Sequence, residues 1–448
     1  MKFTKQSQTL ISFFGEKKCI KHTPQSKKTE QILTGLYHDI LEAQQHIHGL
    51  KKRASKTMTS LGVSNYENFY HLKINKIQSI SQIPTPKMFP SDSFPKEVRE
   101  HINDHVNNHL SYHFSLFGRS IKIEFGVEDA EPELHVDKYN SYVDLMLMWM
   151  YILNQYASSS CSKEITVYLY FTSLLKKLPD TNVQILGANH VNTAFTTTCP
   201  KVSEIIIFRK EEWFKVFMHE TFHNFALDFS DMNVDESHAK IREFFPVKSD
   251  VNLFEAYCET WAEIMNACFC SFMHLQNKEE KEKEKENIDE FLSNCDLLIH
   301  IERNYSFFQM VKTLDFMGLT YNNLYSNTPQ SIVLRDNLYK EDSNVLSYYV
   351  IRTILLNNYQ GFLGWCDTNN TSLLQFKKTT TNQREFCKFI EANYKTQAML
   401  DGVVCIEKLV KNTHQLRKKE HSKDKDKDKI ETLDFLLKNM RMSVCELG

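Results

Sequence analysis

Apolar positions recur at intervals of three and four residues after Glu211, and this pattern predicts a buried helix. Glu211 and Glu212 would place carboxylates in its first turn, where they favour the helix dipole. Neither Gly nor Pro interrupts 211–227. The apolar stripe consists of Trp213, Phe214, Phe217, Phe222 and Phe225. We therefore expect one helix whose apolar face packs against the rest of the chain.

Three other segments have the patterns of strands. Residues 120–127 alternate as in a strand with one exposed face, and 165–171 are apolar enough for a better buried strand. The apolar residues 202–208 come just before the expected helix. A helical pattern covers 29–48, and the C-terminal half is nearly all helical in pattern. The fold class is therefore expected to be α+β, mainly helical, with a small mixed sheet beside the helix.

Proline and polar residues suggest how the chain divides. Residues 1–28 are mostly polar and predict a flexible N-terminal tail. A helical region and a connector interrupted by prolines follow within 29–95, with the connector at 81–95. Residues 96–448 are then expected to form the main domain.

Composition narrows the class of protein. A chain of 448 residues that is 42% hydrophobic can bury a large core, and a formal net charge of −2 gives no overall field for nucleic acid or an anionic membrane. The charge runs at 278–286 and 423–429 alternate in sign and predict exposed linkers. The longest apolar helix, around 145–153, is far shorter than the roughly 20 residues that cross a bilayer, so we expect a soluble protein.

Eleven cysteines are scattered from Cys19 to Cys445 without the paired spacing of a zinc ribbon. Cys268 and Cys270 are separated by one residue and form no C-x-x-C motif. The sequence has no secretory leader, so it predicts free thiols in a reducing compartment, the cytoplasm or the nucleus.

The expected helix carries His219-Glu220-Thr221-Phe222-His223. Two histidines four residues apart lie on one face of a helix and can share a Zn²⁺ ion, while Glu220 can act on a zinc-bound water as general base. The alternative is a pair of histidines whose hydrogen bonds are satisfied in a core or on the surface. The motif predicts a zinc-dependent hydrolase, in particular a peptidase.

A catalytic zinc site needs three protein ligands and an open position for water. The continuation H-x-x-G-x-x-H is absent, because Ala226 and Phe229 occupy the positions of its glycine and last histidine. Asp228 is predicted either to contact a ligand histidine or to stand as a carboxylate at the helix end. The third ligand must therefore come from elsewhere in the chain.

A second helical segment presents carboxylates at i, i+4 and i+8, namely Glu255, Glu259 and Glu263. This spacing can place one glutamate on the metal and the next against the second nitrogen of a ligand histidine. The alternative is the solvated face of an amphipathic helix. The spacing alone leaves both interpretations open.

At these residues the chain resembles the gluzincin metallopeptidases, and the run from Glu255 resembles the E-x-x-x-E helix of the anthrax lethal factor peptidase domain. The resemblance implies that Glu255 is the third zinc ligand and that Glu259 supports a ligand. The two motifs are also similar to metallopeptidases encoded by large DNA viruses, which would act in a host cell. The resemblance covers about 50 residues around the motifs.

The same resemblance sets the expected mechanism. Glu220 would take a proton from the attacking water and pass it to the leaving amine. The mechanism also needs an oxyanion donor, for which Tyr348 and Tyr349 are the candidates, although a core tyrosine pair is the alternative. An edge strand would pair with extended substrate, and 189–198 is the candidate segment.

The N-terminal tail carries a separate signal. Leu10, Phe13 and Phe14 lie at i, i+3 and i+4, and the segment resembles peptides that bind the sliding clamp of DNA replication. Ser7 stands where those peptides have a leading glutamine. In the alternative interpretation, the three residues pack on the protein's own surface.

Two classes of function follow. The first is a zinc peptidase that acts on a protein or peptide substrate. The second is a non-catalytic adaptor or structural protein with a zinc brace, tethered to a sliding clamp by its N-terminus. Glu220 favours the enzyme, because a structural zinc site needs no general base and usually has four His or Cys ligands.

Overall fold

The computed structural model describes residues 2–59, 67–275, 284–421 and 427–448. The chain forms two compact units, each assembled from separate stretches. Unit 1 is built mainly from Gln31–Leu174 and Thr193–Asp231, and unit 2 from Lys2–Glu30, Leu175–Asn192 and Met232–Gly448. These units do not coincide with the consecutive segments 1–28, 29–95 and 96–448 that the sequence suggested. The two charge runs expected to be linkers lie mostly outside the described residues.

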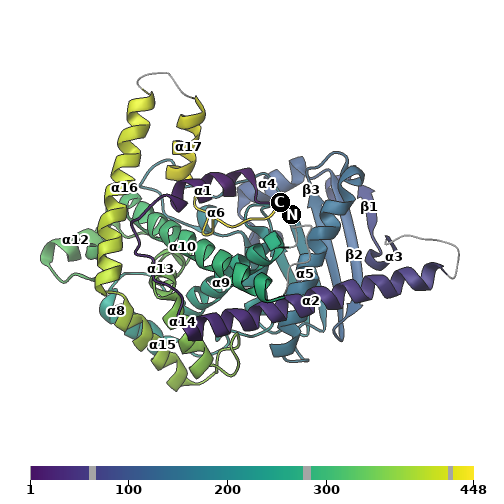
Figure 1. Cartoon of the computed structure of the whole chain (residues 1–448). Helices are drawn as coiled ribbons and strands as arrows, with labels where there is room; N and C mark the ends of the chain where they lie inside the picture. Colours follow the sequence, from purple (N-terminus) through teal and green to yellow (C-terminus); the bar gives the residue numbers. More distant parts are fainter. Residues whose placement is uncertain (1, 60–66, 276–283, 422–426) are drawn as a thin grey trace. The chain divides into compact units, whose positions relative to one another are not determined.

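Unit 1 is built on a six-stranded mixed sheet in the order β1-β2-β3-β4-β6-β5. Its strands β1, β2 and β3 are labelled in Figure 1. The pairs β3–β4 and β4–β6 are parallel, and the other three pairs are antiparallel. The strands are β1 (Lys73–Lys76), β2 (Asn108–Leu116), β3 (Arg119–Val127), β4 (Glu164–Phe171), β5 (Ala194–Thr196) and β6 (Val202–Ile207). The small mixed sheet is confirmed, and the segment considered for substrate pairing contains its edge strand β5.

The three predicted strands are confirmed as β3, β4 and β6. The expected exposed face of β3 is wrong for its C-terminal half, because all residues from Ile123 to Val127 are buried, including Glu124 at 2% exposure. Glu124 can be buried there because its carboxylate pairs with His109 and Lys122. Sequence analysis missed β2, although Leu110, Tyr112 and Phe114 alternate with polar residues and are buried.

Two helices of unit 1 contact the sheet: α3 contacts β2, and α7 contacts β5 and β6. Most of α2 belongs to unit 1 and extends the helix predicted at 29–48. The buried helix α5 confirms the core helix expected around 145–153. The bounds are α2 (Lys27–Thr59), α3 (Glu67–Tyr70), α4 (Lys96–His105), α5 (Val136–Tyr156) and α7 (Trp213–Asn224), with 3₁₀ turns at Ile80–Gln82, Ser91–Ser93 and Pro132–His135. Within the described residues, no helix has the length and apolar character needed to span a membrane.

Helix α7 begins later than the sequence pattern predicted. Glu212 has a φ of 59°, in the left-handed region, so the helix starts at Trp213 and Glu211 lies outside it. Both glutamates are buried rather than exposed in a first helical turn, at 4% and 1% exposure. The apolar stripe was a reliable signal for the helix but not for its first residue, since the local backbone conformation sets the boundary.

Unit 2 is helical, which confirms the prediction for the C-terminal half. Helix α10 contacts α9, α13 and α16, and Figure 1 shows α9 and α10 side by side. The bounds are α1 (Lys5–Gly15), α6 (Ala188–Val191), α8 (Asp235–Phe244), α9 (Leu253–Leu275), α10 (Glu284–Phe316), α11 (Tyr321–Tyr325), α12 (Pro329–Leu338), α13 (Arg352–Asn357), α14 (Tyr359–Asn369), α15 (Thr380–Asn393), α16 (Gln397–His421) and α17 (Lys427–Lys438), with a π-helix at Leu346–Ile351.

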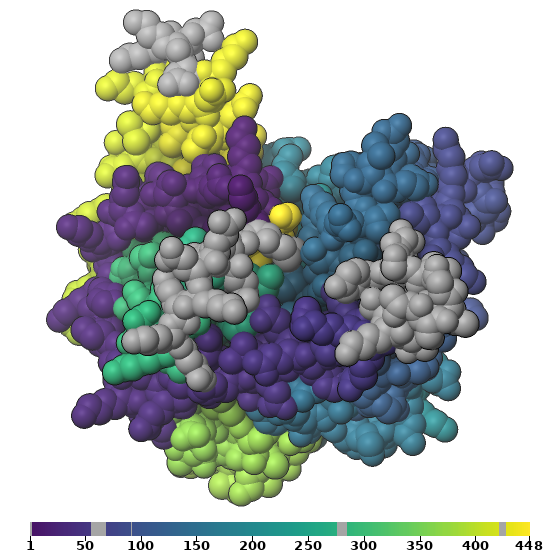
Figure 2. All heavy atoms as spheres, turned by 45° about the vertical axis from the view of Figure 1, so that its right-hand side comes forward, coloured from purple at the N-terminus to yellow at the C-terminus, as the bar shows by residue number. Residues whose placement is uncertain are grey.

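The N-terminal residues, expected to form a flexible tail, contain helix α1. Leu10 and Phe14 are both 0% exposed, and the Phe14 ring lies 5.2 Å from the rings of Tyr305 and Phe308 on α10. Figure 2 shows the purple N-terminal residues beside the green residues of α10 on the surface. In the structure, these apolar residues therefore pack on the protein itself, as the alternative interpretation proposed.

The expectation of eleven free thiols is wrong for four of them. Disulfides join Cys19 to Cys405 in unit 2 and Cys161 to Cys199 in unit 1. Their Cα atoms lie 5.3 Å and 4.6 Å apart, within the range that a disulfide needs, and sequence positions so far apart do not reveal this proximity. The other seven cysteines are free and buried.

Candidate metal centre

Helix α7 is fixed within unit 1 by both packing and hydrogen bonds. It contacts α5, β5 and β6, and all twelve of its residues are buried. The indole Nε1 of Trp149 on α5 donates to Thr221 Oγ1 at 2.8 Å, and that hydroxyl donates to the Phe217 carbonyl at 2.9 Å. The helix is therefore held in one rotational setting on the sheet, which determines the direction of its histidines.

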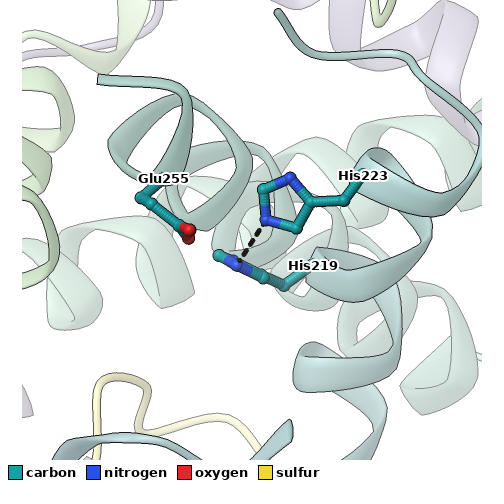
Figure 3. A group of neighbouring side chains, drawn as sticks. All are labelled: His219, His223 and Glu255. Carbon is teal, nitrogen blue, oxygen red and sulfur yellow. Dashed lines mark hydrogen bonds between the residues drawn. The ribbon is translucent and has the colours of Figure 1, made fainter. Parts of the chain in front are cut away.

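His219 and His223 present their imidazoles from consecutive turns of α7 (Figure 3). Their Nε2 atoms lie 3.1 Å apart, and the rings meet at 74°. A tetrahedral zinc with Zn–N distances near 2.1 Å separates two nitrogen ligands by roughly 3.3 Å. The two nitrogens thus have a separation that fits a shared zinc ion.

Asp228 contacts a histidine of the motif, His223, which is the first of the two positions predicted for this carboxylate. Its Oδ2 lies 2.5 Å from His223 Nδ1, and the carboxylate is fully buried. A carboxylate at Nδ1 fixes the tautomer that has its lone pair on Nε2, the nitrogen nearest His219. The Asp228 carboxylate also accepts a hydrogen bond from Ser230 Oγ at 3.0 Å. The Nε2 lone pair of His223 is therefore available to a metal ion.

Glu220 follows His219 on α7 and is 7% exposed. Its position between the two histidines in the motif keeps it on the helix that carries both, as the sequence predicted. A carboxylate that is largely shielded from bulk water is suited to receive a proton from a single positioned water.

The other predicted residues belong to unit 2. Glu255 lies in the first turn of α9, where its side chain is half-buried. Its Oε2 accepts a hydrogen bond from the hydroxyl of Tyr348, at 2.7 Å. Tyr349 instead donates to the Met440 carbonyl at 2.7 Å and is fully buried. The structure thus separates the tyrosine pair into Tyr348, beside a candidate ligand, and Tyr349, in the core.

The remaining glutamates of α9 do not form a solvated face. Glu259 is 2% exposed and Glu263 1% exposed, so that alternative is wrong for both. Burial raises the pKa of Glu263, an effect that the charge of Arg352 opposes. Arg352 Nη1 donates to Glu263 Oε2 at 2.8 Å, in a pair with almost no exposure. Glu263 is therefore part of the helical core, while Glu255 and Glu259 lie toward the start of α9.

Two groups among the described residues could hold a metal ion. In His219, His223 and Glu255, one candidate ligand atom from each residue lies within 4.8 Å of the others (Figure 3). The second group joins His223 and Asp228 to Cys258 under the same limit. The first group fits zinc better, because Asp228 already holds the His223 nitrogen that faces away from His219.

Sequence analysis did not identify the residues that support this centre from neighbouring segments. Trp149 was recognised only as part of an apolar helix and Thr198 only as the end of the candidate segment 189–198, while Ser230 was not considered. Ser230 and Thr198 form one connection. Their hydroxyls lie 2.9 Å apart and connect the loop after β5 to Asp228. Neither residue has a sequence pattern that could reveal this contact, since it forms between segments 32 residues apart.

Comparison with known proteins gave no relative: no family model, curated protein or solved structure matches this chain. The residues and geometry of the candidate centre are therefore the basis for a functional proposal.

Proposed function

We propose that the protein is a zinc-dependent peptidase whose zinc is held by His219, His223 and Glu255. The main support is the pair of Nε2 atoms 3.1 Å apart on a helix, with Asp228 fixing the tautomer of His223. Glu255 belongs to the same group of candidate ligand atoms. Two imidazoles and one carboxylate leave a fourth position open, as a catalytic site requires and a structural site usually does not.

Zinc bound by these residues would polarise a substrate carbonyl and lower the pKa of a coordinated water to about 7. Glu220 accepts the proton that the water loses as its oxygen attacks the peptide carbonyl. The same carboxyl group then delivers that proton to the nitrogen of the departing amine as the C–N bond breaks. Glu220 thus returns to its ionised form at the end of each cycle.

Tyr348 is proposed to stabilise the oxyanion that forms during this attack. Its hydroxyl lies 2.7 Å from Glu255 Oε2, so it is next to a proposed ligand and has a proton to donate. We propose that substrate pairs in extended form with β5, which lies next to β6 at the edge of the sheet that the described residues form. Backbone pairing of this kind tolerates many side chains.

The direct test is hydrolysis of a peptide library by the purified protein, with its metal content measured in parallel. Glu220→Gln should retain zinc and fold but abolish hydrolysis, because an amide cannot accept the water proton. Glu243→Gln is the matched control, since Glu243 is an exposed residue of α8 that pairs with Lys240. Full turnover by Glu220→Gln would rule out this residue as the base, and a protein without bound zinc would contradict the proposal itself.

A further inference from the structure

The Cys161–Cys199 disulfide lies beside the end of the proposed zinc helix. Cys161 precedes β4, and Cys199 lies in the turn between β5 and β6. The amide of Cys199 donates to the carbonyl of Asn224, the last residue of α7, at 3.2 Å. The crosslink therefore joins two loops at the point where α7 ends, one residue after His223.

Asn224 holds both of these loops through its side chain. Its Oδ1 accepts a hydrogen bond from Ser162 Oγ at 2.5 Å, and its Nδ2 donates to Thr196 Oγ1 at 2.9 Å. Ser162 directly follows Cys161, and Thr196 is the last residue of β5. The end of α7 and the edge strand are thus fixed to the residues that the disulfide joins.

The guanidinium of Arg119, the first residue of β3, contacts the same two segments, the Cys161 loop and the end of α7. It donates to the carbonyls of Cys161 and Ser162, the latter at 3.2 Å, and lies over the ring of Phe225 at 4.8 Å. Arg119 is 5% exposed, so these contacts form in a shielded environment. This arginine therefore ties the Cys161 loop to the residue that follows α7.

A chain of hydrogen bonds leads from this crosslink to a zinc ligand. Thr198 precedes Cys199, and its hydroxyl lies 2.9 Å from Ser230 Oγ. Ser230 donates to Asp228 at 3.0 Å, and Asp228 contacts His223 Nδ1 at 2.5 Å. A change in the position of the Cys199 turn would therefore reach the carboxylate that orients His223.

The two cysteine residues differ in exposure. Cys161 is 1% exposed, whereas Cys199 is only partly buried. A small thiolate can attack the Cys199 sulfur, which forms a mixed disulfide and releases Cys161 as a thiolate that takes up a proton. A second thiolate then displaces Cys199, so that two electrons and two protons enter the protein and the small thiol leaves as its disulfide.

We propose that Cys161–Cys199 is a redox-sensitive clasp that positions His223 and the edge strand β5. In the oxidised form the clasp holds the Thr198 turn against Ser230 and the Asn224 side chain against β5. Reduction removes the crosslink and loosens both contacts, which weakens zinc binding. This role rests on the proposed zinc site, but the mobility of α7 and β5 tests it independently.

The test uses the full chain with Cys19→Ser and Cys405→Ser, so that Cys161–Cys199 is its one remaining disulfide. Zinc loss to a chromophoric chelator and amide hydrogen exchange are measured before and after treatment with a water-soluble phosphine. The phosphine and one water convert the disulfide to two thiols and a phosphine oxide. We expect zinc loss to become at least about 10-fold faster, the size of effect seen when support of a ligand is lost. Exchange should increase over 194–200 and 221–230, but not over β2.

Two controls keep the outcome interpretable. A protein with Cys161→Ser and Cys199→Ser should behave like the reduced form and no longer respond to the phosphine. Removal of the phosphine and reoxidation should restore slow zinc loss, which an unfolded protein would not show. Equal zinc loss and equal exchange in the two redox states would overturn the clasp. Absence of zinc from the oxidised protein would overturn the proposed peptidase instead, and exchange alone would then decide the clasp.

Discussion

His223 shows how neighbouring residues turn a common side chain into a candidate metal ligand. Its Nε2 lies 3.1 Å from that of His219, and its Nδ1 lies 2.5 Å from a buried aspartate. The contact with His219 would let the two imidazoles share a zinc ion. The contact with Asp228 determines which nitrogen of His223 carries the proton. An imidazole constrained on both nitrogens loses little further freedom when a metal binds.

Glu255 and Glu259 are expected to differ in their effect on zinc. Glu255→Ala should abolish binding, because only two of the three proposed ligands would remain. Glu259→Ala should weaken binding by about 10- to 100-fold, the usual cost of losing a residue that supports a ligand. Competition with a chelator measures both affinities. If Glu259→Ala empties the site while Glu255→Ala leaves it filled, the two roles are reversed.

Tyr348 and Tyr349 form a matched pair for testing the oxyanion donor. Tyr348→Phe should lower kcat by roughly 100-fold or more with zinc retained, since one hydrogen bond to the transition state is lost. Tyr349→Phe should leave kcat nearly unchanged but lower the free energy of unfolding by about 1 kcal/mol or more, because the Met440 carbonyl loses its donor. Steady-state kinetics and urea unfolding distinguish these outcomes. A similar loss of kcat in both variants would argue against a specific role for Tyr348.

At the scale of elements, α1 shows that the apolar face of a short helix can pack on its own chain and also resemble a peptide that binds another protein. Leu10 and Phe14 are fully buried, and α1 contacts α10, where the Phe13 ring lies 6.5 Å from that of Phe308. These are the same residues that resemble a clamp-binding peptide. Binding to a clamp would require α1 to leave α10 and expose its two buried anchors.

This packing leads to a prediction about the clamp. A synthetic peptide of residues 1–18 should bind a eukaryotic-type sliding clamp more tightly than the whole chain does, since the chain must first release α1. Phe13→Ala with Phe14→Ala in the peptide should remove binding, because a few buried anchors supply most of the affinity. Calorimetry with both forms is the measurement. Absence of binding by the wild-type peptide would restrict α1 to its role in the fold.

At the scale of the whole molecule, acid should destabilise the chain through carboxylates near the end of β3. Burial alone would raise the pKa of Glu128, but hydrogen bonds from Ser173 and His101 leave it below its ordinary value. The pKa of Glu124 is also lowered, since hydrogen bonds from His109 and Lys122 outweigh its burial. Such groups stabilise the fold above their ordinary pKa of about 4.3, and this stabilisation is lost as the pH falls through their lower folded values.

We therefore expect the free energy of unfolding to decrease below about pH 4. Glu128→Gln should reduce this dependence, because the amide does not titrate over that range. Urea unfolding of both proteins between pH 3 and pH 6 provides the comparison. A variant with the same acid dependence as the wild type would show that the Glu128 contacts do not contribute to it.

The sequence alone determined the local patterns. Apolar periodicity located α5, α7 and the strands β3, β4 and β6, because each of these elements buries residues at its own repeat. The spacing of His219 and His223 also placed both on one helix face. These are properties of short segments, so no knowledge of distant contacts was needed to predict them.

Only the tertiary structure decided which distant residues meet. It joined Cys161 to Cys199, and it placed the hydroxyl of Tyr348 against Glu255 but that of Tyr349 against the Met440 carbonyl. It also placed the Phe14 ring against Tyr305 and Phe308. The physical reason is that the chemistry of a side chain depends on the groups packed around it. Those groups come from other segments of the chain, and the number of residues between two segments does not determine their distance in space.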